Sequence, residues 1–298
     1  MKDKKWIGHA AAIATMLVWG TTYIATKVLL DDFKPLEILV LRFAVGFLTL
    51  WILHPHRMKV QDKKHELLFA LAGLSGVCLY FLFQNIALSY TMASNVGVII
   101  SAAPFFTALF SHIFLKGQEK LRINFFAGFL IAIAGIALIS FNGARMQISP
   151  IGDLLTLLAA ALWGVYSVLT DRIAAAGYGT LESTRRIFGW GLVFMLPALA
   201  FVDFSPSVEA LTQPANIFNI LFLGVGASAL CFVSWNFALR RLGTIRSSGY
   251  IYLEPVVTVI TAVILLGDLL TPYTAIGTLL TLGGLVVSEV KFERRKKS

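Results

Sequence analysis

The sequence predicts an all-α membrane protein of ten transmembrane helices arranged as two inverted five-helix repeats. The chain of 298 residues is 57% hydrophobic and only 14% charged, with a mean hydropathy of +0.79. A soluble chain usually carries about 25% charged residues, so lipid must be the solvent for most of this surface. Two further observations complete the prediction: the apolar residues fall into helix-length runs, and the two halves of the chain share motifs.

An internal duplication is visible in motifs that recur at nearly constant offsets and in the same order. A membrane chain built from two copies of one half is typical of a secondary transporter. We therefore expect residues 1–145 to form the first repeat and residues 146–298 the second. The recurring pairs are Trp19-Gly20 with Trp163-Gly164 (offset 144), Asn85-Ile86-Ala87-Leu88 with Asn236-Phe237-Ala238-Leu239 (offset 151), Pro104 with Pro255 (offset 151), and Gly128 and Gly135 with Gly277 and Gly284 (offset 149).

Ten runs are long enough to be spans, because a helix needs about 20 apolar residues to cross the hydrocarbon core. The first run follows a basic N-terminus and has no small-residue cleavage site after it, so we interpret it as a span and not as a removed signal peptide. The ten expected spans are 7–30, 35–53, 66–90, 94–115, 124–141, 152–173, 182–202, 216–239, 246–266 and 272–290.

Turn-forming residues separate these spans. Proline removes no needed backbone donor between helices, and Asp, Asn and Gly favour turns, so both mark span ends. The two longest gaps, 54–65 and 203–215, are too polar to be spans. The marking residues are, in order, Asp31-Asp32, Pro35, Asn142-Gly143, Pro150, Pro206, Pro214, Gly267-Asp268 and Pro272.

Lysine and arginine lie mainly on one side of the expected membrane. Of the 25 in the chain, 19 fall at the N-terminus, in alternate loops and in the C-terminal tail, whereas only Lys34 and Arg145 fall on the opposite side. Basic loops stay in the cytoplasm, so we expect a multi-pass protein of the plasma (inner) membrane with both termini cytoplasmic. Each repeat has five spans, an odd number, so the second copy enters from the opposite side and the repeats are inverted.

These motifs resemble those of the drug/metabolite transporter superfamily, specifically the EamA-type ten-helix permeases, over the whole chain. One departure is that the family often ends its fourth and ninth spans in Leu-Gly-Glu, where this chain has Leu115-Lys116-Gly117-Gln118-Glu119 and Leu266-Gly267-Asp268. The resemblance implies a small-molecule carrier, usually an exporter of amino acids or related metabolites, and does not name the substrate. It rests on the Trp-Gly, Asn-x-Ala-Leu, mid-span proline and Gly-x6-Gly motifs described above.

Glu254 is the leading candidate for substrate binding or proton coupling. It directly precedes Pro255 near the middle of the ninth expected span. An ionisable group at that depth costs roughly 2.5–3.5 kcal/mol, so it must face a cavity, find a partner or stay protonated. Pro255 interrupts the local helix hydrogen bonds, which suits a binding or hinge site. Ala103 occupies the equivalent place in the first repeat. A purely structural pairing of Glu254 between helices is the alternative.

Arg42 is the other charge deep within an expected span. It lies about 10 Å from the outer start of the second span at 1.5 Å per residue. At that depth a long arginine reaches toward the level of Glu254. Arg42 is therefore a candidate counter-charge for Glu254 or for a substrate carboxylate. The alternative is that the side chain extends to the outer surface.

Three other basic residues lie close to the ends of expected spans. Arg185 and Arg186 are within about a turn of the cytoplasmic end of the seventh span, where we expect their side chains to snorkel to water. Lys27 precedes Asp31 by one helical turn, and we expect those two to pair at the outer surface.

Aromatic residues gather on five of the spans. Trp19 and Trp163 lie about 18 Å into theirs, too deep for an interfacial belt, so we expect them to line an apolar cavity that orients a substrate. Asn85 is expected to bind a neighbouring helix, whereas Asn236 has either that role or a ligand contact. Pro104 and Pro255 are expected hinge or packing residues, and the paired glycines are expected to allow close helix packing. The other expected substrate-binding residues are Tyr23, Tyr166, Trp235 and Tyr250.

The motifs of common enzyme classes are missing from the sequence. It has no His-Glu-x-x-His, no P-loop and no Gly-x-Ser-x-Gly, so we expect no enzyme activity, no cofactor and no metal. The net charge of +9 is explained by membrane orientation and not by nucleic acid. The expected partners are a small-molecule substrate and the lipid bilayer, with the protein a monomer or homodimer. A nucleotide-sugar or phosphate-ester carrier, which would want several cavity-facing Lys or Arg, is the alternative carrier. An intramembrane enzyme acting on a lipid-linked substrate is the alternative from another class.

Overall fold

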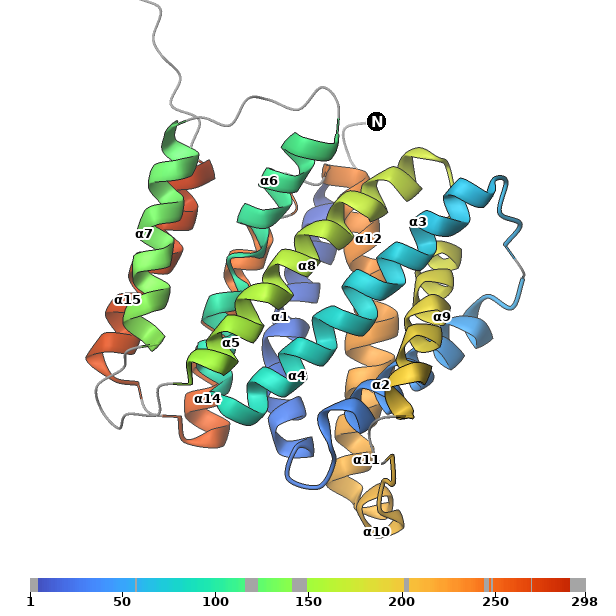
Figure 1. The fold of residues 1–298 in the computed structure, drawn as a ribbon, viewed down its shortest axis with the longest axis horizontal. Coiled ribbons are helices and arrows are strands. Elements are labelled where there is room, and N and C mark those ends of the chain that lie inside the picture. The colour runs from blue at the N-terminus through green and yellow to red at the C-terminus, as the bar shows by residue number, and fades with distance from the viewer. Residues whose placement is uncertain are drawn as a thin grey trace, which may run out of the picture.

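The computed structural model is a bundle of helices, and no strand occurs in the part of the chain that it describes (Figure 1). It describes residues 5–56, 58–115, 123–140, 149–200, 204–243, 247, 249–268 and 270–289. The expected repeat boundary at 145, and most of the basic loop and tail residues, lie outside these ranges. Six described helices are long and apolar enough to cross a membrane: Lys5–Leu29, Pro35–Leu53, Lys63–Tyr90, Ala93–Phe114, Pro150–Ala175 and Pro214–Leu242. The chain is therefore an all-helical, multi-pass membrane protein.

The helices lie where the sequence placed them, with ends that differ by three residues or fewer except in the ninth expected span. A short helix, α10, occupies the 203–215 gap and was not expected. The elements are α1 (Lys5–Leu29), α2 (Pro35–Leu53), α3 (Lys63–Gly73), η2 (Leu74–Leu79), α4 (Tyr80–Tyr90), α5 (Ala93–Ile100), α6 (Ala103–Phe114), α7 (Ile123–Ser140), α8 (Pro150–Ala175), α9 (Thr180–Leu199), α10 (Val208–Thr212), α11 (Pro214–Leu221), η3 (Phe222–Leu230), α12 (Cys231–Leu242), η4 (Gly249–Tyr252), α14 (Leu253–Leu266) and α15 (Pro272–Glu289).

Two of the expected spans are interrupted near their middles. α5 ends at Ile100 and α6 begins at Ala103, with Pro104 in its first turn. In the second half, the 3₁₀ turn η4 leads into α14, and Pro255 lies in the first turn of α14. The ninth expected span, 246–266, is therefore interrupted beside Pro255, as the proline suggested, and its helix α14 begins at Leu253. Proline has no N–H to donate inside a helix, but the first turn needs none, so each proline begins a new helix instead of bending an old one.

Two π-helical segments, η2 and η3, lie within the longest helices of the two halves. The two segments occupy equivalent positions in the two halves. The position 151 residues after Leu74, where η2 begins, lies inside η3, and 151 is also the offset between Asn85 and Asn236. π-helical turns are rare and are frequently found at functional sites. Both segments meet the interior here: the ring of Tyr166 packs against Gly76 of η2, and the carbonyl of Ala227 in η3 accepts a hydrogen bond from Trp19 Nε1 at 2.9 Å.

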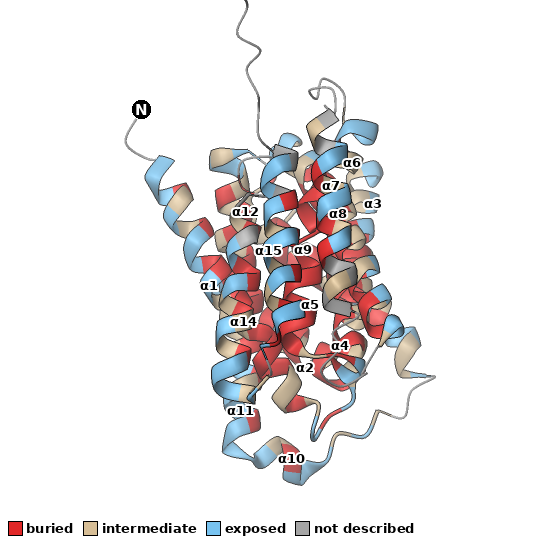
Figure 2. Cartoon of the chain, turned by 90° about the vertical axis from the view of Figure 1, so that its left-hand side faces the viewer, coloured by how far each residue is buried: buried red, intermediate tan, exposed pale blue. Residues whose placement is uncertain are grey.

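The buried residues lie along the inside of the bundle, and the outside is largely exposed, as Figure 2 shows. One aromatic core joins the two halves through Phe43, Phe81, Phe188 and Phe232, with ring centres about 5–6 Å apart. Many large apolar side chains, such as Ile52 and Ile264, are exposed on the outside. Lipid tails are as apolar as these side chains, so such a surface is expected of a membrane protein.

The helices α7 and α15 pack side by side at one edge of the bundle (Figure 1). A Cβ atom on Gly284 would lie 2.5 Å from both Ala132 N and the Gly128 carbonyl, and one on Gly135 would lie 2.5 Å from Thr281 N. These distances are shorter than any ordinary contact, so the two backbones can approach this closely only because both positions are glycine. The expectation that the paired glycines serve close helix packing is confirmed for this pair of helices.

Gly284→Ala is expected to destabilise the protein, because the new methyl group meets backbone atoms that can move only if α7 and α15 separate. Overpacking of this kind costs about 1–3 kcal/mol. Gly283→Ala is the matched control, since nothing lies within 4 Å of a Cβ at that position. Gly283→Ala should leave the stability unchanged or raise it by up to about 1 kcal/mol, because alanine has a higher helix propensity than glycine. The midpoint of thermal unfolding in detergent separates the two; equal midpoints would contradict the close contact.

Candidate functional site

A cavity lies at the centre of the bundle between helices from both halves. About 400 Å³ of it is not filled by atoms, but only about 20 Å³ is open to the centre of a water-sized molecule. That is room for roughly one ordered water, so side chains must move before a larger ligand fits in the cavity. Its lining residues are Trp19, Thr22, Tyr23, Arg42, Tyr80, Phe81, Gln84, Ile100, Ala103, Trp163, Ile251 and Glu254.

The carboxylate of Glu254 supplies one end of the polar lining. Glu254 is buried in the first turn of α14, where the exposed amides of a helix start favour negative charge. The hydroxyl of Tyr23 donates to Glu254 Oε1 at 2.6 Å. The Thr258 hydroxyl donates to the Gly20 carbonyl at 2.9 Å, which ties α14 to α1. These contacts fix the position of the carboxylate from two helices.

The Trp-Gly motifs bring helices of the two halves together around the cavity. A Cβ atom on Gly20 would lie 2.6 Å from Val257 and 3.0 Å from the Glu254 carbonyl, so glycine lets α1 approach α14. Gly164 does the same for α8, since a Cβ there would lie 2.8 Å from the backbone of Phe106 in α6. In each case the glycine places the preceding tryptophan at the cavity beside the start of an interrupted helix.

Arg42 supplies the opposite charge. It is 1% exposed, so the alternative that its side chain extends to the outer surface is wrong. Arg42 Nε donates to Ser228 Oγ at 2.7 Å, and the guanidinium carbon lies 4.2 Å from the ring centre of Phe81, within cation–π range. The terminal nitrogens Nη1 and Nη2 have no hydrogen-bond partner, and neither has Nε2 of Gln84. Leaving a buried donor unpaired costs about 1–3 kcal/mol, and more when it is charged.

Glu254 and Arg42 do not pair with each other. No ion pair joins them in the described part of the chain; Glu254 binds Tyr23, and Arg42 binds Ser228. The expectation that Arg42 is the counter-charge of Glu254 is therefore not met in this conformation. Both nevertheless line one cavity. The cavity thus presents a carboxylate and a cluster of unpaired donors as separate polar groups.

Aromatic rings form much of the remaining wall. Trp19 and Trp163 meet edge to face, with ring centres 5.4 Å apart, and both line the cavity as expected. Trp235 is 2% exposed and packs against Trp19 with ring centres 5.6 Å apart, but it does not reach the cavity. Its role is to support Trp19 from behind.

Trp163→Phe is expected to weaken ligand binding about threefold to tenfold, because the lost ring contact is worth about 0.5–1.5 kcal/mol. Trp235→Phe is the matched control: the same substitution, in a tryptophan that supports the wall without lining it. It should lower the unfolding midpoint and leave ligand affinity of the folded protein within about twofold. Titration of both purified variants with the same ligand makes the comparison; equal losses of affinity would mean that the cavity is not where the ligand binds.

Three expected binding residues lie away from the cavity. Tyr166 packs on η2, the Tyr250 hydroxyl contacts His9 Nδ1, and Asn236 Nδ2 donates to Thr184 Oγ1 at 2.9 Å. Asn85 does bind a neighbouring helix, because its Nδ2 donates to the Pro35 carbonyl at 3.1 Å. The central cavity therefore uses fewer of the expected residues than the sequence suggested.

The site also contains polar groups that were not expected from the sequence, among them Gln84 and Ser228. Gln84 lines the cavity from α4, and Ser228 in η3 holds Arg42. Gln84 had a readable signal, since it is an uncharged amide inside an apolar run beside the recurring Asn85. Ser228 had none, because a serine in a membrane helix usually bonds to its own backbone.

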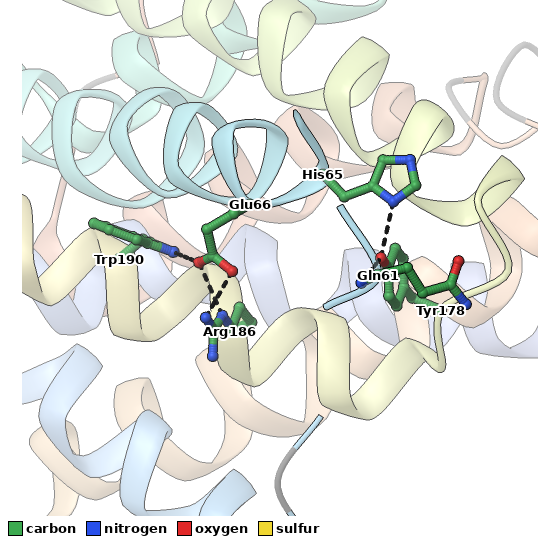
Figure 3. Close-up of polar contacts among 6 residues, drawn as sticks. All are labelled: Gln61, His65, Glu66, Tyr178, Arg186 and Trp190. Carbon is green, nitrogen blue, oxygen red and sulfur yellow. Dashed lines mark hydrogen bonds and ion pairs between the residues drawn. The ribbon is translucent and has the colours of Figure 1, made fainter. Parts of the chain in front are cut away.

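Polar contacts join the helices at the end of the bundle where α3 begins and α8 ends (Figure 3). Arg186 pairs with both carboxylate oxygens of Glu66, at 3.0 and 2.6 Å, and Trp190 Nε1 donates to the same carboxylate at 2.5 Å. Arg185 is buried and donates to the carbonyls of the loop after α2. The expectation that its side chain snorkels to water is therefore wrong for Arg185, whereas Arg186 pairs with Glu66 and keeps 41% of its side chain exposed.

Polar contacts join the helices at the opposite end of the bundle as well. Lys27 Nζ donates to the carbonyls of Leu88 and Thr91, so the expected Lys27–Asp31 pair is replaced by a bond between α1 and the end of α4. The hydroxyl of Ser94, at the start of α5, donates to Asp268 Oδ2 at 2.8 Å. Polar contacts therefore join the helices at both ends of the bundle.

A central cavity lined from both halves, helices broken at mid-span and matched π-helical segments are together features of a membrane transporter. The EamA-like transporter family model matches residues 6–141 and again residues 150–289. The chain therefore belongs to the EamA-like transporter family, which confirms the resemblance found in the sequence.

Relatives of this chain carry transporter names. An uncharacterized transporter of Archaeoglobus fulgidus is 28% identical over 288 residues, covering 95% of this chain and 97% of the relative. A probable terminal-alkyne amino-acid exporter of Streptantibioticus cattleyicolor is 28% identical over 281 residues, covering 93% and 91%. The uncharacterized inner membrane transporter YedA of Escherichia coli is 25% identical over 263 residues, covering 88% and 83%. One solved crystal structure shares the fold, with a TM-score of 0.66, 24% identity and coverage of 95% of this chain and 96% of the other.

Proposed function

We propose that this protein exports small zwitterionic metabolites, amino acids or close analogues of them, across the plasma membrane. The observation that carries the proposal is a set of unpaired buried donors: Arg42 Nη1 and Nη2 and Gln84 Nε2 lack partners in the same cavity that Glu254 lines. An arginine binds a carboxylate through two parallel hydrogen bonds, and Glu254 complements an ammonium group. A ligand with both groups satisfies the cavity at once.

The aromatic walls complement the rest of such a ligand. Tyr80, Phe81 and the two cavity tryptophans offer ring faces to an apolar side chain, and cavities of this kind orient a ligand with few polar groups. The name of the Streptantibioticus relative supports an amino-acid substrate and an outward direction. A phosphate ester or nucleotide sugar suits the cavity less, because Glu254 repels its negative charge and Arg42 is the one basic residue of the described lining.

Transport proceeds by alternating access between two five-helix repeats, residues 1–145 and 146–298, of opposite orientation. Pro104 and Pro255 lie in the first turns of the restarted helices α6 and α14, and the π-helical segments correspond at the same offset, as expected of equivalent elements. Half-helix starts at the centre of the membrane are typical of such carriers. No chemical step is needed: the protein acts as a carrier and not as an enzyme.

Both termini face the cytoplasm in this proposal, because 19 of the 25 lysines and arginines lie on that side. Reporter fusions after Ser298 and within the 203–215 loop are expected to report opposite sides of the membrane. Reporters that agree, or a periplasmic C-terminus, would overturn both the orientation and the inverted repeats.

The substrate class is tested by thermal stabilisation of the purified protein, since a ligand that binds the native state raises its stability in proportion to RT ln(1 + [L]/Kd). The panel contains the common L-amino acids, their N-acetyl and amide derivatives, sugar phosphates and a nucleotide sugar. At least one free amino acid is expected to stabilise the protein and to be carried into proteoliposomes, whereas its blocked derivatives do neither. Stabilisation by phosphate esters alone would refute the proposal.

A further inference from the structure

A second cavity lies between the ends of α8, α9 and α12, at the end of the bundle that we propose faces the cytoplasm. About 440 Å³ of it is not filled by atoms, and about 50 Å³ is open to the centre of a water-sized molecule. It is therefore roomier than the central cavity. The polar side chains of its lining come from Thr170, Asp171, Thr180, Ser183, Asn236 and Arg240.

Two of these side chains present buried polar atoms without a partner. Asn236 Oδ1 and Ser183 Oγ make no hydrogen bond, although Asn236 is 9% exposed and Ser183 is 5% exposed. Thr184 fixes the orientation of the Asn236 amide. The Thr184 hydroxyl donates to the Thr180 carbonyl, so the Thr184 oxygen is left to accept a hydrogen bond from Asn236 Nδ2. Oδ1 is therefore the atom left over. Unpaired buried acceptors of this kind need a water or a ligand to offset their cost.

Arg240 supplies a positive charge to the same cavity. One of its terminal nitrogens donates to the Tyr178 carbonyl, and the guanidinium has further N–H groups to offer. The Tyr178 hydroxyl meets His65 Nδ1 at 2.8 Å and accepts from Gln61 N at 3.0 Å, as Figure 3 shows. Arg240 thus links this cavity, through Tyr178, to the start of α3. Asp171 adds a carboxylate to the lining.

We propose that this second cavity is an entry site for the transported zwitterion. The substrate carboxylate binds Arg240, and the ammonium group donates to Asn236 Oδ1 and Ser183 Oγ, near the carboxylate of Asp171. The ligand class rests on the proposed function; the site itself rests on the two unpaired atoms. A carboxylate at Arg240 competes with the Tyr178 carbonyl, so substrate arrival loosens the contact between α12 and the α8–α9 turn.

The test is the number of ligands bound per chain, measured by equilibrium dialysis with the radiolabelled L-amino acid that stabilises the purified protein most among the common ones. Two sites are expected for the unmodified protein. Arg240→Gln and Ser183→Ala should each weaken one of them by about tenfold or more, because a hydrogen bond to a charged group is lost. Arg42→Gln should weaken the other site alone.

Arg241→Gln is the matched control, because Arg241 lies over the ring of Phe237 and does not line the cavity. It removes the same charge one residue away and should leave both sites intact. Ser183→Ala removes an unpaired hydroxyl, so it should fold even if Arg240→Gln does not. One bound ligand per chain, lost in Arg42→Gln and unchanged in Ser183→Ala, would mean that the second cavity holds water only, and the proposed function would stand. No binding of any amino acid would overturn both.

Discussion

Arg42→Gln is expected to lower the affinity for a zwitterionic substrate by about 30-fold or more, and transport at low substrate concentration by the same factor. Truncating one partner of a buried, hydrogen-bonded charge pair costs about 2–5 kcal/mol, and tenfold in affinity corresponds to about 1.4 kcal/mol. Without substrate, the folded protein should be no less stable than the unmodified protein, because the substitution removes a buried charge whose terminal nitrogens have no partner.

That combination separates a binding role from a structural one. Thermal unfolding without ligand gives the stability, and ligand titration of the same preparation gives the affinity. Ser228→Ala is the graded control, since it removes the hydrogen bond to Arg42 Nε but keeps the charge, and it should give a smaller loss of affinity. A large loss of stability with unchanged affinity in the folded fraction would make Arg42 a structural residue.

Glu254→Gln is expected to lower zwitterion affinity by a similar factor, because glutamine keeps the shape and removes the charge that complements the ammonium group. The affinity for the N-acetylated analogue, which has no ammonium group, should not fall. Tyr23→Phe, which removes the hydrogen bond to Oε1 and keeps the carboxylate, should cost less. Transport in proteoliposomes with and without a proton gradient provides the measurement, together with ligand titration.

Two other outcomes are informative for Glu254. If the glutamine variant still exchanges substrate across the membrane but no longer responds to a proton gradient, Glu254 carries the coupling proton and does not bind the amino group. If rate, affinity and response to the gradient are all unchanged, Glu254 only holds α14 against α1, and the proposed site is wrong.

The helices were predictable from the sequence because the membrane requires long apolar runs, and proline and glycine mark their ends. The place where a helix restarts was not. Pro255 was visible as a disturbance, but only the structure shows that it begins α14 and so puts Glu254 at a helix start. The Trp-Gly motifs were visible as repeats, and their physical reason, the close approach of Gly20 to α14, depends on contacts 200 or more residues apart.

The site was predictable in part. Glu254, Arg42, Trp19, Tyr23 and Trp163 line the cavity as the sequence suggested. Depth along a span was readable, but the direction in which a side chain points around the helix was not. The structure pairs Arg42 with Ser228 and not with Glu254, and gives Arg186 a partner in Glu66, 120 residues away. Which helices become neighbours decides such partners, and one sequence does not show it.

The central claim, that Arg42 and Glu254 hold opposite ends of one zwitterion, is tested most directly by a binding cycle. The affinities of a free amino acid, its amide and its N-acetyl derivative are measured for the unmodified protein, Arg42→Gln and Glu254→Gln. We expect that blocking the carboxyl group of the ligand lowers its affinity for Arg42→Gln only slightly. Likewise, blocking the amino group should lower the affinity for Glu254→Gln only slightly. The contrary result is that the losses of binding free energy from blocking a ligand group and from replacing a residue simply add in every combination. That result would show that these residues do not contact those ends of the ligand.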